Sequence, residues 1–415
     1  MCGKYNAADS LGYSGRRKLL EVDMKRIAFV NQRYGREVNG GSEYYTRLIA
    51  EHLTKEYEVE VLTTKALDYT TWEDHYTEDV EDINGVTVRR FSVDRPREMK
   101  RFLKINDVIP TNTKRTPEEE EEWMDEQGPY CPKLINYIRE QAKEYDLFIF
   151  VTYLYYTTCR GIEEVANKAV LIPTAHDEPY IYFSIFQKEF HLPKAIVYLT
   201  EEEKEFVQGR FHNEEVASVV TAVGVDLPPQ TCTQEEIAKL PEDPYLIYVG
   251  RIEGGKGCGE LFSFFEEYKR RNPNKVKLVL MGKEVLEIPK HPDILYLGFV
   301  SEEMKFEGIR RSMALVLPSY FESLSISVLE ALQVKTPVLV NGHCHVLKGH
   351  CTRSNAGLYY KGYEEFEGSV NYLERHPEER MAMGENGAIY VEKEYQWDIV
   401  VNKLKTLFDS AMEGE

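Results

Sequence analysis

The sequence predicts an α/β protein with two domains, each built around a parallel β-sheet. Short apolar runs alternate along the chain with loops and amphipathic helices, which is the order of βαβ units. The chain has 415 residues, more than one hydrophobic core usually supports. A polar stretch from Pro228 to Pro244 interrupts the alternation and marks the domain boundary. We therefore expect a first domain over residues 24–228 and a second over residues 229–394.

Composition narrows the class of protein. Hydrophobic residues make up 42% and charged residues 29% of the chain, which is typical of a globular protein, and no apolar run is long enough to cross a bilayer. The formal net charge of -19 disfavours general nucleic-acid binding. Seven scattered cysteines, an odd number, favour reduced thiols over a disulfide framework. We expect a cytoplasmic protein, with peripheral contact to a membrane as an open possibility.

The first βαβ unit follows a segment that we expect to be an extension. Residues 1–23 lack the continuous apolar core of a signal peptide and are interpreted as flexible. After Met24 the run IAFVNQ has the composition of a buried parallel strand. Gly40 and Gly41 then permit close backbone approach, and Ser42 opens a helix that leads to the strand EVEVLTT. The glycine loop is predicted at the carboxyl edge of the sheet, where α/β proteins bind ligands; a plain tight turn is the alternative.

Further strands of the first half are predicted in VTVRRF, LFIFVTY and AVLIPTAHDE. Residues 95–131, between the first two, form an irregular stretch in which a helix begins late, with Thr116 as N-cap and Pro117 at the first helical position. The acidic run 118–122 then complements the helix dipole rather than forming a metal site. The basic segment before it is predicted to be a solvated face, and docking to an anionic or membrane-borne acceptor is the alternative.

His176 lies where the strand of AVLIPTAHDE runs out into a loop, followed by an aromatic cluster. A histidine at the carboxyl end of a parallel strand is well placed to touch a bound ligand. A purely structural role for this side chain is the alternative.

The second half opens with a strand, a glycine-rich loop and a helix, in YLIYVGRIEGGKGCGELF. The loop carries Gly250, Arg251 and Lys256, and each charge-assisted hydrogen bond from such a cation contributes roughly 1.5 to 3 kcal/mol. The string nearly matches a P-loop, but Gly257 stands where that loop needs a Ser or Thr to hold Mg²⁺. The pattern therefore favours a metal-independent diphosphate site over a P-loop ATPase.

Three more strands are predicted in VKLVLMGKE, ILYLGFV and ALVLPS. Two acids follow the last of them. Glu322 lies in the loop after that strand, and Glu330 lies about two turns into the amphipathic run of the next helix. Amides at a helix N-terminus attract phosphate, and carboxylates beside them accept hydrogen bonds from sugar or ribose hydroxyls. The alternative is that both acids are solvated surface charges. The second phosphate-competent loop in the same domain argues against this alternative.

The stretch NGHCHVLKGHC, residues 341–351, gathers side chains of the types that bind zinc. These are His343, Cys344, His345, His350 and Cys351. Their spacing matches no common zinc pattern, so we expect a shaped loop near the ligand edge, with a metal site as the alternative. The final residues, 395–415, are predicted to form a helix that packs back on the first domain.

From about Met24 onward the chain resembles the retaining glycosyltransferases of glycosyltransferase family 4, also described as glycosyl transferases group 1. The resemblance rests on GRIEGGKG, the spaced acids of PSYFESLSISVLEAL, the early NGGSE loop and PTAHDE. It implies the GT-B architecture, in which two Rossmann-like domains with parallel sheets face an interdomain cleft. Two departures concern the donor sugar: Ser323-Leu324-Ser325 stand where the family usually has Gly-Phe-Gly, and Lys335 precedes Thr336-Pro337 where a glycine is common.

The resemblance also implies roles for individual residues. Arg251 and Lys256 would bind the donor diphosphate, and Glu322 the donor sugar hydroxyls. Glu330 would bind the ribose hydroxyls, and His176 would contact the sugar. The remaining expected donor-site residues are Gly40, Gly41, Gly250, Gly298, Phe299, Val300, Ser323, Leu324 and Ser325.

The function implied is retaining transfer of a hexosyl group from a UDP- or GDP-linked sugar to an acceptor hydroxyl in glycan or glycoconjugate biosynthesis. The acceptor is a carbohydrate, a lipid-linked molecule or another hydroxyl compound, and neither a metal nor a cofactor beyond the donor is expected. Two rivals remain, a nucleotide-sugar epimerase of the same fold and a non-catalytic nucleotide-sugar binding protein. Conversion of the donor without an acceptor would indicate the first, and binding without any product would indicate the second.

Overall fold

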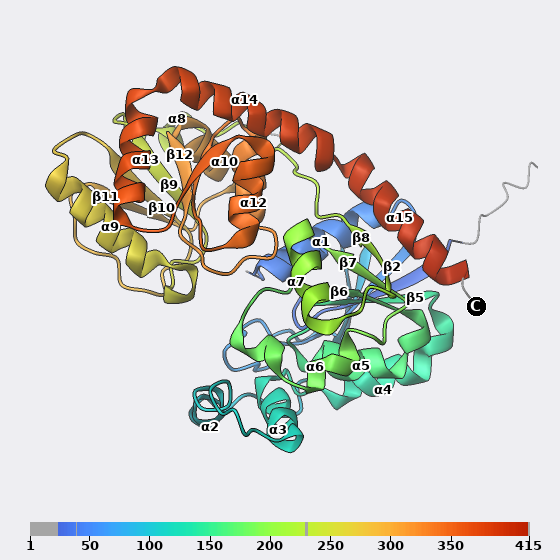
Figure 1. The fold of residues 1–415 in the computed structure, drawn as a ribbon. Helices are drawn as coiled ribbons and strands as arrows, with labels where there is room; N and C mark the ends of the chain where they lie inside the picture. The colour runs from blue at the N-terminus through green and yellow to red at the C-terminus, as the bar shows by residue number, and fades with distance from the viewer. Residues whose placement is uncertain (1–23, 39, 229–230, 414–415) are drawn as a thin grey trace, which may run out of the picture.

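The structure, a computed structural model, describes residues 24–38, 40–228 and 231–413. It contains two parallel-sheet α/β domains, seen as two separate bodies in Figure 1. The extension predicted for residues 1–23 lies outside the described residues. In the described part of the chain, no helix combines the length and the apolar character that a bilayer crossing requires.

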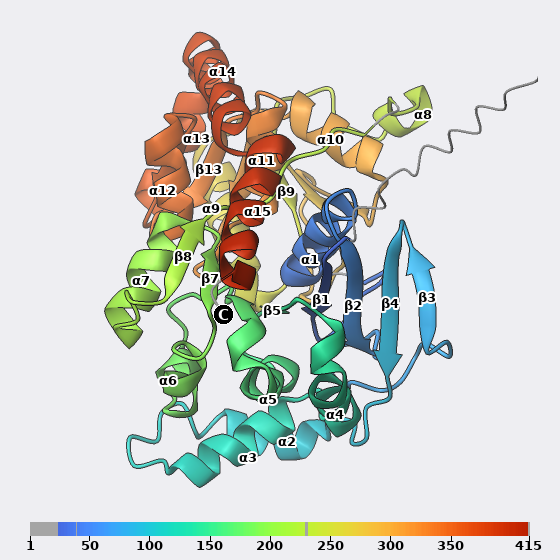
Figure 2. The same cartoon turned by 90° about the vertical axis from the view of Figure 1, so that its right-hand side faces the viewer.

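The first domain is built on an eight-stranded sheet of order β3-β4-β2-β1-β5-β6-β7-β8. Its neighbouring strands pair in parallel except β3 and β4, which are antiparallel. The strands are β1 (Arg26–Val30), β2 (Glu58–Thr64), β3 (Val80–Ile83), β4 (Val86–Phe91), β5 (Leu147–Val151), β6 (Ala169–Ile172), β7 (Ala195–Tyr198) and β8 (Ala217–Val220). Figure 2 shows the edge formed by β4 and β3.

Helices cover both faces of this sheet. In β1, Ile27 and Phe29 belong to one buried apolar cluster and Ala28 and Val30 to another, as expected when successive side chains point to opposite, covered faces. The helices are α1 (Gly41–Leu53), α2 (Met99–Asn106), α3 (Pro117–Gln127), α4 (Pro132–Gln141), α5 (Tyr156–Glu164), α6 (Ile185–Glu189) and α7 (Glu201–Phe211). Short 3-10 turns occupy Ala142–Glu144, Ala166–Lys168 and Pro179–Tyr182.

The second domain is built on a six-stranded, fully parallel sheet of order β11-β10-β9-β12-β13-β14. Its strands are β9 (Tyr245–Val249), β10 (Lys277–Met281), β11 (Ile294–Gly298), β12 (Ala314–Leu317), β13 (Val338–Asn341) and β14 (Gly357–Tyr360). The chain order reverses between β9 and β12, so the loops after these two strands flank the crevice where open α/β sheets bind ligands. The same reversal lies between β1 and β5 of the first sheet.

Eight helices and one 3-10 turn complete the described part of the second half. They are α8 (Gln234–Ile237), the turn Gly254–Lys256, α9 (Cys258–Arg271), α10 (Glu302–Arg311), α11 (Ile326–Gln333), α12 (His345–Ser354), α13 (Tyr363–Arg375), α14 (Pro377–Glu394) and α15 (Trp397–Glu413). The last helix crosses back to the first domain, as Figure 1 shows at its red end, and packs on β7, β8 and α1. There Trp397 stacks on His52 with 3.4 Å between ring centroids, and the Tyr57 hydroxyl donates to Asp409 at 3.1 Å.

The helix start predicted at Thr116 is confirmed. Thr116 is the N-cap of α3; its hydroxyl accepts from the Glu119 N–H, and the Glu119 carboxylate accepts from the Thr116 N–H, with Pro117 at the first position. This reciprocal capping box satisfies two backbone donors that would otherwise have no partner. The acidic run therefore belongs to a helix terminus.

Three elements differ from expectation. The stretch expected to be irregular before Thr116 contains α2, whose single buried side chain, Phe102, gives almost no apolar period. The edge strand β3 was not expected, because only Ile83 in it is buried. The loop expected over residues 341–351 is wrong: a short turn leads into α12, whose buried face includes Val346, Leu347, His350 and Cys351. Because histidines and cysteines occupy several positions of this stretch, the sequence does not show the apolar period of a helix there.

Candidate functional site

A cavity of about 710 Å³ lies between the two domains, at the carboxyl ends of both sheets. The loops after β1, β6 and β7 line it from the first domain, and the loops after β9, β10, β11 and β12 line it from the second. Every residue predicted for the donor site except Gly298 lines this cavity. They are Gly40, Gly41, His176, Gly250, Arg251, Lys256, Phe299, Val300, Glu322, Ser323, Leu324, Ser325 and Glu330.

The loop between β9 and α9 supplies the two predicted cations. The Arg251 guanidinium lies 3.2 Å from a Glu253 carboxylate oxygen, and its carbon lies 5.0 Å from the centre of the Tyr69 ring, which belongs to the first domain. Gly257 caps α9 with φ 75°, and a Cβ there would lie 2.4 Å from the Pro318 carbonyl oxygen. A serine or threonine therefore does not fit at this position, so the P-loop arrangement for Mg²⁺ is excluded by packing.

Residues 318–325, which we call the Glu322 loop, connect β12 to α11. The Lys256 ammonium lies 2.8 Å from a Glu322 carboxylate oxygen, with both side chains partly shielded from solvent. This contact joins the loops after β9 and β12, the two strands that flank the reversal of the sheet. A cation suited to phosphate and an acid suited to hydroxyl groups thus lie side by side.

Backbone donors follow Glu322. Within the described residues, the N–H groups of Ser323, Leu324 and Ser325 form no hydrogen bond, and the N-terminus of α11 has no side-chain cap. Ser325 has φ 68°, a left-handed conformation that is uncommon for a residue other than glycine. Free amides beside a helix N-terminus form an anion site, and here Arg251 and Lys256 add positive charge to it.

Glu330 lies one turn into α11, nearer the helix start than the two turns expected. Its side chain is buried and accepts a hydrogen bond from the Lys305 ammonium at 2.7 Å, and Lys305 also lies 2.6 Å from Glu302. Burial disfavours the Lys305 ammonium, but the two carboxylates outweigh that cost and raise the pKa of Lys305 above its ordinary value. One Glu330 oxygen is therefore held by a permanent cation, which fixes the carboxylate at the cavity.

The first domain contributes the turn before α1. The Glu43 carboxylate accepts hydrogen bonds at 3.0 Å from the side chains of Gln32 and Arg33, and all three residues are buried. A Cβ on Gly40 would lie 2.1 Å from Glu43, so the glycine is required by close contact with the carboxylate. This buried network holds Gly40 and Gly41 against the cavity.

His176 follows β6 and faces the Glu322 loop across the cavity. Its ring centre lies 5.5 Å from that of Phe321, and its Nδ1 atom lies 3.5 Å from a Glu178 carboxylate oxygen. The Tyr153 hydroxyl donates to the same Glu178 oxygen at 2.7 Å. The histidine is thus brought to the site from a loop that Glu178 and Tyr153 hold in place.

At the end of β11, Gly298 has a structural role, whereas Phe299 is exposed at the cavity. Gly298 does not line the cavity; its carbonyl accepts from the Gly282 N–H at 2.8 Å, a hydrogen bond between the carboxyl ends of the parallel strands β10 and β11. Phe299 lines the cavity with 77% of its surface exposed, and Val300 follows it. A flat apolar side chain open to solvent at a cavity mouth offers a stacking surface for an aromatic ring.

Sequence reasoning missed three contacts at this site. Lys305 holds Glu330, Tyr69 faces Arg251 from the other domain, and the Thr200 hydroxyl donates to the Ser323 carbonyl at 3.3 Å. Thr200 followed by Glu203 carries the signal of a helix N-cap, which the structure has at the start of α7, but that signal says nothing of the contact across the domains. The other two residues have no local signal.

The histidines and cysteines of residues 341–351 do not gather around a common point. His350 is buried, and burial together with nearby Arg353 lowers its pKa to about 4, so its imidazole is neutral. Burial raises the pKa of the Cys344 thiol to about 11 and that of Cys351 to about 12. Across the described ranges there is no cluster of three or more His, Cys, Asp or Glu side chains placed to hold a metal ion.

Taken as chemistry, the cavity can hold a di-anion with hydroxyl-bearing groups on both sides of it. Arg251, Lys256 and free amides line the cavity together with two acids, Glu322 and Glu330, and the exposed ring of Phe299. The volume falls in the range of about 300–1,000 Å³ found for small-ligand sites. These features occur in a chain whose net charge is -19, so the positive charge is local to the site.

Residues 231–389 match the family model described as glycosyl transferases group 1. Among curated proteins, the capsular polysaccharide biosynthesis glycosyltransferase CapM of Staphylococcus aureus is 22% identical over 192 residues, 43% of this chain and 50% of that protein. The alpha-D-kanosaminyltransferase of Streptomyces kanamyceticus is 27% identical over 187 residues, 41% of this chain and 46% of that protein. The chain spans about half the length of these relatives.

Solved structures match nearly the whole chain. Sucrose-phosphate synthase from Thermosynechococcus elongatus superposes with a TM-score of 0.70 at 16% identity, covering 94% of this chain and 100% of that one. HepE of Anabaena, solved with UDP and glucose, gives a TM-score of 0.64 at 14% identity, covering 93% and 100%. At such identities the likeness shows the fold, which is the GT-B fold of these enzymes. Residues 231–389 are thus similar to the glycosyl transferases group 1 family, and the chain as a whole has the GT-B fold.

Proposed function

We propose that the protein is a retaining, metal-independent glycosyltransferase that uses a UDP- or GDP-linked sugar. The observation that carries the proposal is the contact between Lys256 and Glu322, at 2.8 Å, beside free amides at the start of α11. This arrangement puts positive charge and an acid where a diphosphate meets a sugar. The family match of residues 231–389 supports the same class of activity.

The donor is proposed to lie along the second domain. Its diphosphate binds Arg251, Lys256 and the amides of the Glu322 loop, since these groups are cations and unpaired donors. Its sugar hydroxyls bind Glu322 on one side. Its ribose hydroxyls bind Glu330 on the other, at the oxygen that Lys305 leaves free, and its base lies by Phe299 and Val300.

The names of two solved neighbours support a nucleotide-sugar donor. HepE of Anabaena was solved with UDP and glucose, and a protein described as trehalose-6-phosphate from E. coli was solved with UDP-2-fluoro glucose. The curated relative CapM is named for capsular polysaccharide biosynthesis. We infer from these that this chain takes part in glycan or glycoconjugate synthesis.

In the proposed reaction, the bond between the anomeric carbon and the terminal phosphate oxygen breaks while a bond to the acceptor oxygen forms. The acceptor proton moves to the departing phosphate oxygen on the same face of the sugar, so the anomeric configuration is retained. Negative charge grows on the diphosphate as it leaves, and Arg251, Lys256 and the loop amides stabilise it there. Glu322 binds hydroxyls and is not a covalent nucleophile.

The first domain is proposed to hold the acceptor. Gly40 and Gly41 approach the outer phosphate, and His176 contacts the sugar from the side facing Phe321. Closure of the domains over both substrates would exclude water and limit hydrolysis of the donor.

Replacement of the cations tests the diphosphate site. Arg251→Ala and Lys256→Ala are each expected to lower kcat by about 100-fold or more, since each removes a charge that stabilises the leaving group. The measurement is release of UDP or GDP from the nucleotide sugar that most raises the melting temperature of the wild-type protein. Lys275→Ala, at an exposed lysine on the same domain, is the matched control and should leave the rate unchanged. Full activity in both cation variants would remove the diphosphate role.

Glu330→Gln is expected to weaken nucleotide binding by about tenfold while lowering kcat less, because the ribose hydroxyls bind equally in the ground and transition states. Titration calorimetry with UDP and GDP measures the change. Glu364→Gln, on the exposed face of α13, serves as control. Unchanged affinity for both nucleotides in Glu330→Gln would place the ribose elsewhere.

Removal of divalent ions tests the metal-independent reaction. Turnover in excess EDTA is expected to equal turnover in added Mg²⁺ or Mn²⁺, because side-chain cations and backbone amides neutralise the diphosphate. The assay compares initial rates of nucleotide release on chelator-treated protein. A rate that collapses in EDTA and returns with metal contradicts this part of the proposal.

A further inference from the structure

His350 is a buried polar side chain with a contact to the active loop. It lies in α12, outside the cavity, with 0% of its surface exposed. Its Nε2 atom lies 2.8 Å from the carbonyl oxygen of Leu324, in the Glu322 loop, and its Nδ1 atom lies 3.2 Å from the Tyr390 hydroxyl. Both ring nitrogens therefore have partners, one of them in the loop that carries the proposed site.

The partners fix the direction of these hydrogen bonds. A carbonyl oxygen can only accept, so Nε2 carries the proton and donates it to Leu324. In the neutral imidazole Nδ1 then accepts from the Tyr390 hydroxyl. The Tyr390 oxygen lies 2.9 Å from the Tyr395 hydroxyl, which must in turn be the donor of that contact. A chain of donors runs from Tyr395 through Tyr390 and His350 to Leu324, and Arg353 Nε also donates to the Tyr390 hydroxyl at 3.4 Å.

The Leu324 carbonyl controls the next amide. In a planar trans peptide the C=O and the following N–H point in opposite directions. Because His350 holds the Leu324 oxygen toward α12, the N–H of Ser325 is directed away from α12. Ser325 lines the cavity, and its N–H has no partner among the described residues. The histidine thus sets the direction of one amide of the proposed diphosphate site.

The loop has a strained residue next to the Leu324 carbonyl, and a second side chain holds the carbonyl of Ser323. Ser325 adopts φ 68°, which costs free energy for a residue with a Cβ and is kept only where the surroundings enforce it. The Thr200 hydroxyl bonds the Ser323 carbonyl from the first domain. The side chains of Thr200 and His350 therefore hold two consecutive carbonyls, those of Ser323 and Leu324. Neither side chain lines the cavity.

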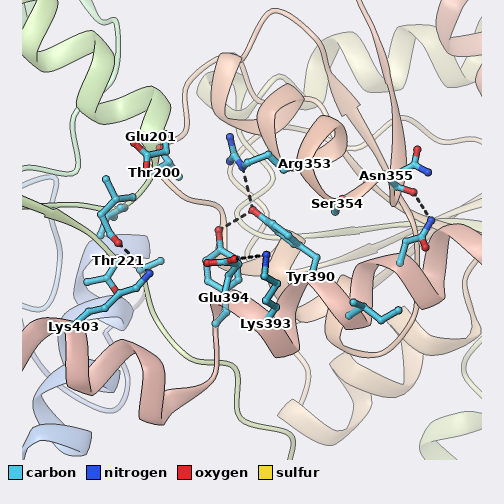
Figure 3. A pocket seen from close by; sticks show the side chains of 16 residues that line it. Thr200, Glu201, Thr221, Arg353, Ser354, Asn355, Tyr390, Lys393, Glu394 and Lys403 are labelled. Atoms are coloured by element: carbon cyan, nitrogen blue, oxygen red, sulfur yellow. Dashed lines mark hydrogen bonds and ion pairs between the residues drawn. The ribbon is translucent and has the colours of Figure 1, made fainter.

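The outer end of the chain of donors lies at the junction of the domains. Tyr390 and Tyr395 line a second cavity of about 590 Å³, and Figure 3 shows Tyr390 beside Arg353, opposite Thr200 and Thr221 of the first domain. Tyr395 lies between α14 and α15, and α15 packs on the first domain. The Glu322 loop is thus connected by hydrogen bonds to the segment where the chain crosses between domains.

We propose that His350 is a positioning residue for glycosyl transfer, which aims the Ser325 N–H at the leaving diphosphate by holding the Leu324 carbonyl. Tyr390 keeps the imidazole in the tautomer that makes this possible, and Tyr395 supports Tyr390. The inference rests on the proposed function, because it assigns the Ser325 amide to the departing phosphate. It gives a role to a histidine that zinc chemistry does not explain.

Two substitutions at one position separate positioning from packing. His350→Leu removes the donor, and His350→Gln keeps an N–H that can reach the Leu324 carbonyl. His350→Leu is expected to lower kcat about 10- to 100-fold, somewhat less than loss of a whole transition-state donor. The dissociation constant for UDP should change by less than about threefold, since the amide acts mainly in the transition state. His350→Gln should recover kcat to within about fivefold of the wild type.

The control and a second variant guard against misfolding. His345→Leu, at an exposed histidine of the same helix, should leave kcat and UDP affinity unchanged. Tyr390→Phe removes the hydroxyl that fixes the tautomer and should lower kcat about three- to tenfold with normal UDP binding. It stands in for His350→Leu if that variant does not fold, as judged by its thermal melt.

Each outcome decides the proposal. A kcat that falls in His350→Leu and recovers in His350→Gln, with UDP affinity kept, supports it. Equal losses in both variants indicate a packing role and overturn it, as does an unchanged kcat in His350→Leu or, where that protein does not fold, in Tyr390→Phe. If the wild-type protein binds neither UDP nor GDP and releases neither from any nucleotide sugar, the proposed function itself fails, which the wild-type assay alone reveals.

Discussion

The contact between Lys256 and Glu322 is the interaction on which the site depends. It joins the loops after β9 and β12, which can meet because these strands are neighbours in the sheet, although two strands and two helices lie between them in the chain. The reversal of strand order between β9 and β12 opens the crevice, and Gly257 lets α9 approach the Pro318 carbonyl closely enough to bring the loops together. A side chain at Gly257 would separate the cation from the acid.

The two domains supply different kinds of group to the cavity. The second domain supplies charged groups and donors: Arg251, Lys256, the free amides and the two acids, Glu322 and Glu330. The first supplies close backbone approach at Gly40, held by the buried Glu43 network, and a histidine after β6 in a loop that the hydrogen bond from Tyr153 to Glu178 helps to hold. Such an arrangement suits a reaction in which one domain holds a charged donor while the other shapes the space for an acceptor.

Much of the fold and of the candidate site could be predicted because the sequence patterns that indicate them lie within short stretches of the chain. The alternation of apolar strands and helices identifies the parallel sheets, and Thr116 with Pro117 marks a helix start without tertiary information. Gly250, Arg251 and Lys256 stand in one loop, and Glu322 and Glu330 share one strand-loop-helix unit, so each set is visible as a short string. The pairing of β9 with β12 then brings the two strings to one cavity.

The rest depends on contacts through space. The sequence does not distinguish Lys305 from the other lysines. It lies 2.7 Å from Glu330 because α10 packs beside α11. His350 was grouped with neighbouring cysteines as a zinc ligand type, since nothing in the string shows that its ring would point at Leu324, 26 residues away in the chain. Gly298 is predicted at the ligand, but its carbonyl bonds the carboxyl end of β11 to that of β10. Side chains that act on another loop leave no periodic pattern.

The central claim is that Arg251, Lys256 and the amides of residues 323–325 together bind a diphosphate between Glu322 and Glu330. A crystal structure of the protein with UDP or GDP bound tests this most directly. We expect phosphate oxygens within hydrogen-bonding distance of Lys256, Arg251 and the Ser325 N–H, with ribose hydroxyls on Glu330. A nucleotide that lies outside this crevice, or one whose phosphates contact neither cation, would contradict it.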